Sequence, residues 1–354
     1  MLSAFRSASA ASTRWRLVAV LAAILPTAAA CAQPAETAPR DGLLNGAPDP
    51  TGVATVNAAG ETVYYVAATG RGVNLLRSTD LKHWQPVGSV FDKPVPDWAR
   101  REVPGTHGIW APDLSYHDGL YYLYYSVSTF GSQRSVIGLA VNKSLDPESD
   151  DYQWQDRGKV VESNPRDNDF NAIDPALLVD QEGRWWLFWG SYWSGLKVAE
   201  IDPATGKLAA DAKIRPVAAR PDVPSHAIEA AFVVFHEGYY YLFVSWDACC
   251  DGADSTYKVM VGRSRDAAGP YVDADGKQML AGGGTLVLAS SERWRGPGHN
   301  GVITTDAGQW MVHHTYDMQN LEAQRILQVR PLTWNADGWP EVGEPLAVAE
   351  DGGP

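Results

Sequence analysis

Gly119-Leu-Tyr-Tyr-Leu-Tyr-Tyr-Ser126 places four tyrosines in eight residues directly after a glycine. A dense aromatic run that follows a turn residue is typical of a β-strand. The pattern occurs four more times in the chain, in Glu61-Thr-Val-Tyr-Tyr-Val-Ala67, Gly183-Arg-Trp-Trp-Leu-Phe-Trp-Gly190, Gly238-Tyr-Tyr-Tyr-Leu-Phe-Val-Ser245 and Gly308-Gln-Trp-Met-Val-His-His-Thr315. The first aromatic residues of the five runs lie 57, 64, 54 and 71 residues apart. The chain is therefore a fivefold internal repeat.

Each repeat is long enough for about four strands, which is the size of one blade of a β-propeller. Helices are expected to be scarce because no long segment keeps an apolar period of 3.6 residues. Five repeats predict an all-β fold, a five-bladed β-propeller, in a single catalytic domain over residues 41–354. The alternative is a pair of β-sandwich domains made of hairpins, but no linker divides the repeats.

The first forty residues differ in character from the repeats. Arginines precede an apolar run (17–30) and an alanine-rich segment, as in a secretory signal, and the run is too short to span a membrane. We interpret residues 1–32 as a signal peptide and residues 33–40 as a tether. Ordinary cleavage and a lipoprotein signal with lipid on Cys31 both stay open. A secreted or periplasmic protein is expected, with an outer-membrane lipoprotein as the alternative.

Composition narrows the class of partner. The 29 Lys and Arg against 42 Asp and Glu give a net charge of -13, which argues against nucleic acid and anionic membrane surfaces. Fourteen Trp and fifteen Tyr suit half-exposed surfaces, because each ring carries a polar group on an apolar body. A neutral or cationic partner is expected, no nucleic acid is expected, and membrane contact is expected only through a lipid on Cys31. We expect a monomer.

A polar or aromatic residue stands at the head of each repeat, in the order Asp49, Trp110, Asp174, Glu229 and His299. In the last four repeats it precedes the first aromatic residue by 10 or 11 positions. The first strand of a propeller blade lines the central channel, so these residues are expected to form a ring at one mouth. A single Asp next to Pro is more often a turn residue, but three acids in one ring favour chemistry.

Glycoside hydrolysis requires such a ring. One carboxylic acid protonates the leaving oxygen while a carboxylate on the opposite side activates water. A third acid raises the pKa of the proton donor by like-charge repulsion and orients it.

Eight short motifs, in order, carry a family resemblance. They are Trp110-Ala-Pro-Asp113, Tyr125-Ser-Val-Ser-Thr-Phe-Gly-Ser132, Asn171-Ala-Ile-Asp-Pro175, Gly190-Ser-Tyr-Trp-Ser-Gly195, Tyr240-Tyr-Leu-Phe-Val-Ser245, Gly296-Pro-Gly-His299, Arg330-Pro-Leu-Thr-Trp334 and Asp337-Gly-Trp-Pro340. From Gly42 to Val342 the chain resembles glycoside hydrolase family 43, in particular its endo-α-1,5-L-arabinanases. The resemblance implies a five-bladed propeller and an inverting mechanism.

The resemblance also implies roles for individual residues. Asp49 would be the general base, Glu229 the general acid, and Asp174 the residue that tunes and orients the acid. Substrate contacts would come from Asp49, Trp110, Phe130, Gly131, Asn171, Ala172, Ile173, Asp174, Ser191, Tyr192 and Trp193. His299 matches a histidine that helps to hold an axial metal ion, usually calcium, largely through water. From spacing alone, His299 is equally well a structural histidine.

The chain departs from the family pattern in two places. Pro48 stands where the family often has His, and Ala231 stands where it often has Pro, but neither change removes a carboxylate. Cys249 and Cys250 match a vicinal pair of the family. Because a vicinal disulfide is strained, we interpret the pair as packed thiols that line the cleft.

These observations predict an enzyme that cuts internal α-1,5 bonds in linear arabinan and binds arabino-oligosaccharides. An exo-acting α-L-arabinofuranosidase or β-xylosidase of the same family is the first alternative, and the open-groove segment Ser128-Thr-Phe-Gly-Ser132 argues against it. A non-catalytic carbohydrate-binding propeller is the second alternative. It would not need all three acids.

Overall fold

The computed structural model describes residues 46–57, 59–320 and 324–346. The described residues all belong to one compact unit. The expected signal peptide, its Cys31 and the tether lie outside the described residues. No helix in the described ranges is long and apolar enough to cross a membrane.

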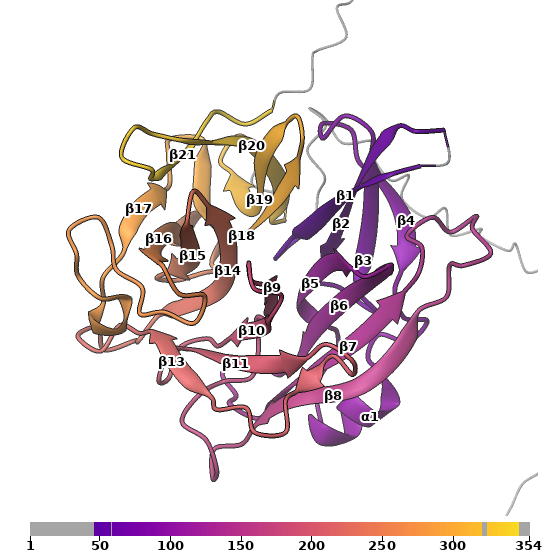
Figure 1. Ribbon diagram of the computed structural model, residues 1–354, viewed down its shortest axis with the longest axis horizontal. Helices are drawn as coiled ribbons and strands as arrows, with labels where there is room; N and C mark the ends of the chain where they lie inside the picture. The colour runs from indigo at the N-terminus through magenta and orange to yellow at the C-terminus, as the bar shows by residue number, and fades with distance from the viewer. Residues whose placement is uncertain (1–45, 58, 321–323, 347–354) are drawn as a thin grey trace, which may run out of the picture. The chain divides into compact units, whose positions relative to one another are not determined.

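Five antiparallel sheets are arranged around a common centre, and each is built from consecutive strands (Figure 1). Blade by blade, the strands are β1 (Thr51–Val56), β2 (Thr62–Ala68), β3 (Asn74–Ser78) and β4 (Gln85–Ser89); β5 (Trp110–His117), β6 (Leu120–Val127), β7 (Ser135–Asn142) and β8 (Gln155–Ser163); β9 (Ala176–Val179), β10 (Trp185–Trp189), β11 (Leu196–Asp202), β12 (Lys207–Leu208) and β13 (Arg215–Ala218); β14 (Ile228–His236), β15 (Tyr239–Trp246), β16 (Lys258–Ser264) and β17 (Thr285–Leu288); β18 (Trp294–Thr305), β19 (Gly308–Asp317), β20 (Ile326–Trp334) and β21 (Pro340–Val342). The five-bladed β-propeller is confirmed, and the β-sandwich alternative is wrong.

Helical structure is scarce among the described residues, as the sequence predicts. It consists of one short α-helix and two 3₁₀ turns, α1 (Asp97–Glu102), η2 (Gly252–Asp254) and η3 (Met279–Ala281).

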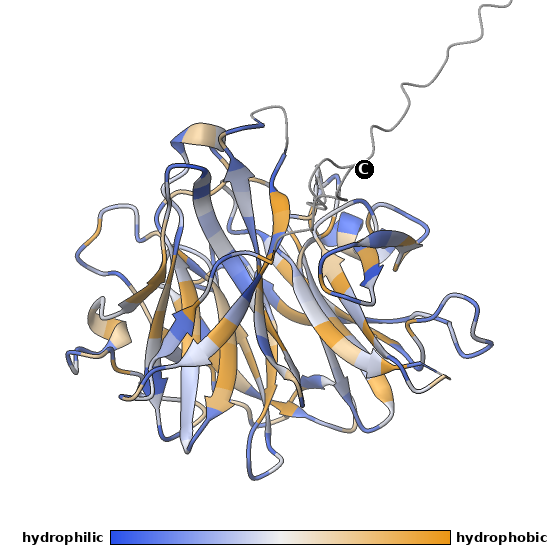
Figure 2. Cartoon of the chain, turned by 90° about the horizontal axis from the view of Figure 1, so that it is seen from above, coloured by the Kyte–Doolittle hydropathy of each residue, from blue (hydrophilic) through white to orange (hydrophobic). Residues whose placement is uncertain are grey.

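The five aromatic runs form the second strand of every blade, namely β2, β6, β10, β15 and β19. Their side chains fill the spaces between neighbouring blades, and Tyr125, Trp189 and Phe243 are completely buried. Figure 2 shows the apolar residues concentrated along the strands and the hydrophilic residues in the connecting loops. The core is thus a set of interfaces between blades, and the aromatic repeat is the sequence signature of these interfaces.

The ring closes without exchanging a strand between the first and last blades, because β1–β4 and β18–β21 each form a complete sheet. The first and last blades are instead held together by hydrogen bonds and by a contact between aromatic rings. The backbone N–H of Gly46 donates to the carbonyl oxygen of Arg325 (3.2 Å), and the ring of Tyr64 meets that of Trp310 edge to face at 6.2 Å. On the channel side, the N–H of Asp49 donates to Nδ1 of His314 (3.0 Å). We call these contacts the seam, and the expected general base is part of it.

Candidate active site

One non-glycine residue near the start of each blade has a left-handed backbone conformation. These residues are Asp49 (φ 53°), Ala111 (41°), Asp174 (58°), Ala230 (58°) and His299 (50°). Such a conformation is costly for residues other than Gly, so it needs support from its surroundings.

In four blades that support is a side chain of the preceding blade, which accepts the backbone N–H of the left-handed residue. The acceptors are His314 for Asp49, Thr69 for Ala111, Ser126 for Asp174 and Ser245 for His299. In the remaining blade, Oδ2 of Asp174 accepts the N–H of Ala230 (3.1 Å).

The five head residues of the sequence pattern are therefore not strictly equivalent. Trp110 and Glu229 each precede the left-handed residue of their blade by one position, whereas Asp49, Asp174 and His299 occupy it. The pairing of β5 with β6 shifts between Trp110 and Asp113, and that of β14 with β15 shifts between Glu229 and Phe232.

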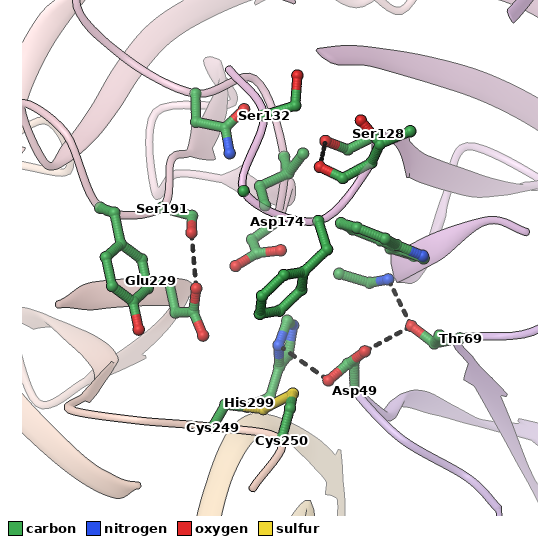
Figure 3. A pocket seen from close by; sticks show the side chains of 18 of the residues that line it. Asp49, Thr69, Ser128, Ser132, Asp174, Ser191, Glu229, Cys249, Cys250 and His299 are labelled. Carbon is green, nitrogen blue, oxygen red and sulfur yellow. Dashed lines mark hydrogen bonds and ion pairs between the residues drawn. A yellow bond between two sulfur atoms is a disulfide. The ribbon is translucent and has the colours of Figure 1, made fainter. Parts of the chain in front are cut away.

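A cavity of about 660 Å³ opens at this mouth of the propeller (Figure 3). All three predicted catalytic acids and His299 line it. The remaining lining residues are Thr69, Trp110, Ala111, Ser128, Thr129, Phe130, Gly131, Ser132, Asn171, Ile173, Ser191, Tyr192, Trp193, Ser225, His226, Cys249, Cys250 and Arg325.

Of the eleven predicted substrate-binding residues, only Ala172 is absent from the lining, and it is fully buried. Asn171 is also buried, and its Oδ1 accepts the hydroxyl of Ser135 (2.6 Å). In contrast, Phe130 is 91% exposed and Trp193 is 36% exposed, which leaves apolar rings free to face a sugar.

Asp49 is surrounded by a hydroxyl, two imidazoles and a cation. Thr69 donates its hydroxyl to Oδ2 (2.5 Å), while Nη1 of Arg325 and the Nδ1 atoms of His299 and His314 lie 3.5, 3.4 and 3.2 Å from Oδ1. Burial alone would raise the pKa of Asp49, but His299, Arg325 and His314 lower it well below its usual range. Burial also lowers the pKa of both histidines, so near neutral pH Arg325 is the cation that faces an ionised Asp49.

Glu229 has the opposite character. Removal from water raises its pKa, and the charge of Asp49 adds to this, although hydrogen bonds from Ser191 and Tyr257 oppose it. Ser191 donates to Oε2 (2.6 Å) and Tyr257 donates to Oε1 (2.8 Å). Asp174 is buried nearby, and desolvation, Glu229 and Asp49 raise its pKa well above the usual value. The site therefore combines one carboxyl group whose pKa is lowered with two whose pKa values are raised.

The sequence analysis missed four of these partners, namely Thr69, Tyr257, His314 and Arg325. They lie far along the chain from the acids that they contact, so local spacing does not reveal them. The one available signal is His314, which stands in the fifth aromatic run where other runs have a small or aromatic residue.

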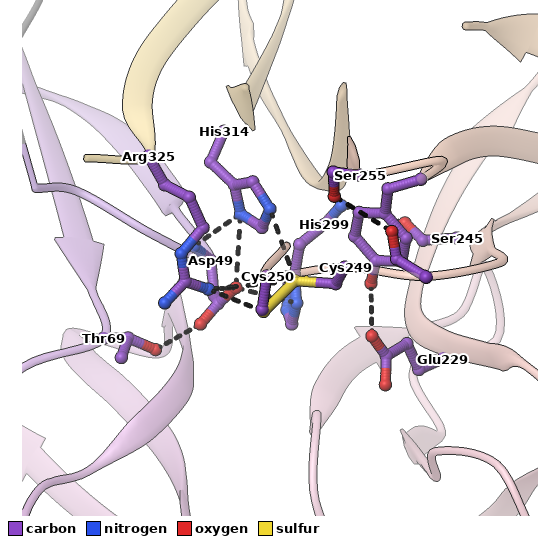
Figure 4. The surroundings of a disulfide bond; sticks show 12 residues. Asp49, Thr69, Glu229, Ser245, Cys249, Cys250, Ser255, His299, His314 and Arg325 are labelled. Atoms are coloured by element: carbon purple, nitrogen blue, oxygen red, sulfur yellow. Dashed lines mark hydrogen bonds and ion pairs between the residues drawn. A yellow bond between two sulfur atoms is a disulfide. The ribbon is translucent and has the colours of Figure 1, made fainter. Parts of the chain in front are cut away.

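The interpretation of Cys249 and Cys250 as free thiols is wrong, because the two residues form a disulfide (Figure 4). The prediction gave too much weight to the cost of a vicinal bond. The loop between β15 and β16 turns both sulfur atoms toward Arg325, whose Nη1 lies 3.3 Å from Sγ of Cys250, and Nε2 of His314 lies 3.9 Å from Sγ of Cys249. The position of the pair in the cleft is as predicted.

His299 is the expected ligand of a metal ion. Within the described ranges, no three His, Cys, Asp or Glu side chains are grouped to hold an ion. Burial lowers the pKa of His299 to about 4, so the imidazole is neutral and has a lone pair to offer. An ion at this place would therefore have the imidazole of His299 as a ligand and would otherwise be held through water.

Two carboxyl groups that face one cavity and have pKa values shifted in opposite directions are the arrangement that acid–base glycoside hydrolysis uses. Family comparison agrees, since the sequence model of glycosyl hydrolases family 43 matches residues 45–340. The chain belongs to this family and is a glycoside hydrolase.

Two relatives and one solved structure illustrate the similarity. The chain is 41% identical over 290 residues to the extracellular exo-α-(1→5)-L-arabinofuranosidase ArbA of Cellvibrio japonicus, covering 79% of this chain and 83% of the relative. It is also 41% identical over 281 residues to the extracellular endo-α-(1→5)-L-arabinanase 1 of Bacillus subtilis, covering 78% and 83%. A Cellvibrio cellulosa α-L-arabinanase structure complexed with arabinohexaose superposes with a TM-score of 0.78 at 38% identity, covering 85% of this chain and 96% of that chain.

Proposed function

We propose that this protein hydrolyses internal α-1,5-L-arabinofuranosidic bonds of linear arabinan with inversion of configuration. The observation that carries the proposal is the opposite tuning of Asp49 and Glu229 across one cavity. The names of the relatives and the arabinohexaose complex support arabinan and its oligosaccharides as the substrate class.

In the proposed mechanism, Asp49 removes a proton from water as the water attacks the anomeric carbon. Glu229 gives its proton to the glycosidic oxygen as that bond breaks. Asp49 comes from blade 1 and Glu229 from blade 4, so the two acids approach the cavity from separate blades, and the inverting mechanism places a water between the sugar and the base. Asp174 keeps a carboxyl group beside Glu229 and fixes the start of β14 through its bond to the N–H of Ala230.

Relatives of equal identity are named as exo-acting and endo-acting enzymes. We favour the endo-acting function because the exposed rings of Phe130 and Trp193 come from two successive blades and extend the lining beyond the acids. The exo-acting alternative is supported by the Cellvibrio japonicus relative, which is named an exo-α-(1→5)-L-arabinofuranosidase.

The deciding experiment is hydrolysis of linear arabinan, with viscosity and reducing ends followed in parallel. Endo-cutting lowers viscosity early, when few reducing ends have formed, and gives oligosaccharides of several lengths. Release of arabinose or of one short oligosaccharide from the first minutes, at nearly constant viscosity, would assign the exo-acting function. Glu229→Gln is the inactive control.

We also propose a calcium ion at the channel, held by His299 and otherwise through water. A cation there would add to Arg325 in offsetting the negative charge of Asp49. Metal analysis of dialysed protein should find a bound ion in the wild type and less of it in His299→Ala. The substitution should lower activity strongly and change the melting temperature little. Full activity of dialysed, metal-free wild type contradicts this proposal.

Export of the protein is proposed from the leader-like first 32 residues and from relatives that are named extracellular. Intact mass after expression with the leader, together with detergent phase partition, distinguishes ordinary cleavage from lipidation at Cys31.

A further inference from the structure

Tyr257 lies beneath the proposed general acid and does not line the cavity. It is 1% exposed, and its hydroxyl donates to Oε1 of Glu229 at 2.8 Å. The other oxygen, Oε2, is bonded to Ser191, which does line the cavity. The two oxygens of the acid therefore face different surroundings, one the protein interior and the other the substrate side.

The direction of the hydrogen bonds under Glu229 follows from a backbone group. The N–H of His299 can only donate, and it donates to Oγ of Ser245 (2.9 Å). The side chain of Ser245 lowers the pKa of Tyr257, and because its oxygen already accepts a hydrogen bond, its own hydrogen is free to point at the phenol. Tyr257 then directs its hydrogen at Oε1. Figure 4 shows Ser245 and Glu229 on this side of the site.

The ring of Tyr257 has little freedom to move. It lies nearly parallel to the imidazole of His314, with 5.8 Å between ring centres and 14° between planes. A Cβ added to Gly298 would come within 2.1 Å of the phenol ring, so the glycine permits the close approach. The hydroxyl is thereby held in place under Glu229.

We propose that Tyr257 is the positioning residue of the general acid, and that it reserves Oε1 as an acceptor so that the transferable proton is carried on Oε2. Ser191 can accommodate both states of Oε2, because a hydroxyl can donate to the carboxylate and accept from the acid. The inference rests on the proposed function, since it takes Glu229 as the proton donor.

The test is Tyr257→Phe, which removes the hydroxyl and keeps the ring. A hydrogen bond to a charged group stabilises the ionised form, so its loss should move the basic limb of the pH profile of kcat/KM upward by about one pH unit. The other charged or titratable groups that face Glu229 are Asp49, Asp174, Tyr192 and Arg325, and the variant leaves all four unchanged.

On arabino-oligosaccharides, kcat of Tyr257→Phe should fall about tenfold or more, as part of the ~10²–10⁴ that general acid catalysis contributes, with little change in KM. The matched control is Tyr271→Phe, which removes another fully buried phenol of the same blade, one that donates to the carbonyl of Ala267 (2.5 Å) away from the cavity. This control should keep the wild-type rate and pH profile.

Ser245→Ala provides a second measurement. It removes the hydroxyl next to Tyr257 in the series that leads from the N–H of His299 to Glu229, and it leaves the phenol in place. It should move the basic limb in the same direction by a smaller amount. Unchanged pH profiles in both variants, with Glu229→Gln inactive, would overturn the inference while the proposed function stands. Activity retained in Glu229→Gln would instead remove the proposed function itself.

Discussion

Asp49 and Glu229 are carboxyl groups on one cavity, yet their neighbours shift their pKa values in opposite directions. Donors and Arg325 surround the first, whereas desolvation and the negative charge of Asp49 dominate around the second. The surroundings therefore favour the role of base for Asp49 and the role of acid for Glu229.

Substituting the two acids separately tests this assignment. Glu229→Gln should lower cleavage of arabinan by about 10²–10⁴ and largely spare an aryl arabinofuranoside whose leaving group needs no proton. Asp49→Asn should impair both substrates, because the attacking water then lacks its base. Rates with the two substrates, and oligosaccharide binding by calorimetry, give the readout. Losses of only a few-fold in both variants would contradict the roles.

At this scale the sequence predicts the acids but not their partners. Spacing to the aromatic runs identifies Asp49, Asp174 and Glu229. Their partners Arg325 and Tyr257 become neighbours only when separate blades or distant parts of one blade come together, and no local pattern records that approach.

Among the elements, β5 contains a buried acid that the mechanism does not use. Asp113 is 3% exposed and joins three blades, since it accepts the hydroxyl of Thr51 (3.2 Å) and the N–H of Leu177 (2.7 Å). Burial raises its pKa to about 7, despite the two hydrogen bonds. The folded protein therefore keeps this proton over a pH range in which the unfolded chain releases it.

The consequence is a stability that declines as pH rises from about 4 to about 7, by on the order of 4 kcal/mol from this group alone. Asn cannot ionise, so the melting temperature of Asp113→Asn relative to wild type should increase across that range. Asp180→Asn is the control. Although burial opposes it, hydrogen bonds from Trp186 and Arg184 lower the pKa of Asp180, so this variant should lose stability relative to wild type above about pH 4. A pH-independent difference for Asp113→Asn would contradict the prediction.

The loop between β15 and β16 gives a second prediction at this scale. In denatured but unreduced protein, neither Cys249 nor Cys250 should react with iodoacetamide, and both should react after reduction, as peptide masses will show. Reduction of the native enzyme should also lower activity several-fold, because Arg325 loses its contact with the bonded pair. Labelling without reduction would restore the free-thiol interpretation.

The sequence predicts which segments form strands, but it does not predict where the pairing between two strands shifts. The aromatic runs became the second strands of the blades because dense β-formers between turn residues admit few other structures. The shift in pairing after Trp110 and Glu229 has no comparable signature, since it depends on how β5 and β14 meet the channel.

For the whole molecule, the seam between the first and last blades combines ring closure with catalysis. The N–H of Asp49 bonds to His314, and its carboxylate contacts Arg325. Opening this interface would separate the base from its partners before the blades themselves unfold. Activity should therefore be lost at a lower temperature than far-UV circular dichroism.

Two substitutions separate the seam from other interfaces. Trp310→Phe weakens the contact with Tyr64 in the seam and should widen the gap between inactivation and unfolding. Trp185→Phe weakens a similar edge-to-face contact, with Tyr122 between the second and third blades, and should lower both temperatures together. Equal gaps in the two variants would show that the seam is not the weakest interface.

The seam also has a consequence for the biosynthesis of the enzyme. Asp49 and His314 are separated by 265 positions, so almost the whole chain must be synthesised before the base meets its partner. A nascent or truncated polypeptide can contain complete blades, and even all three acids, without an assembled base. The arrangement therefore predicts that hydrolysis begins only after the last blade has joined the first, so that synthesis of the chain and onset of its activity are separate events.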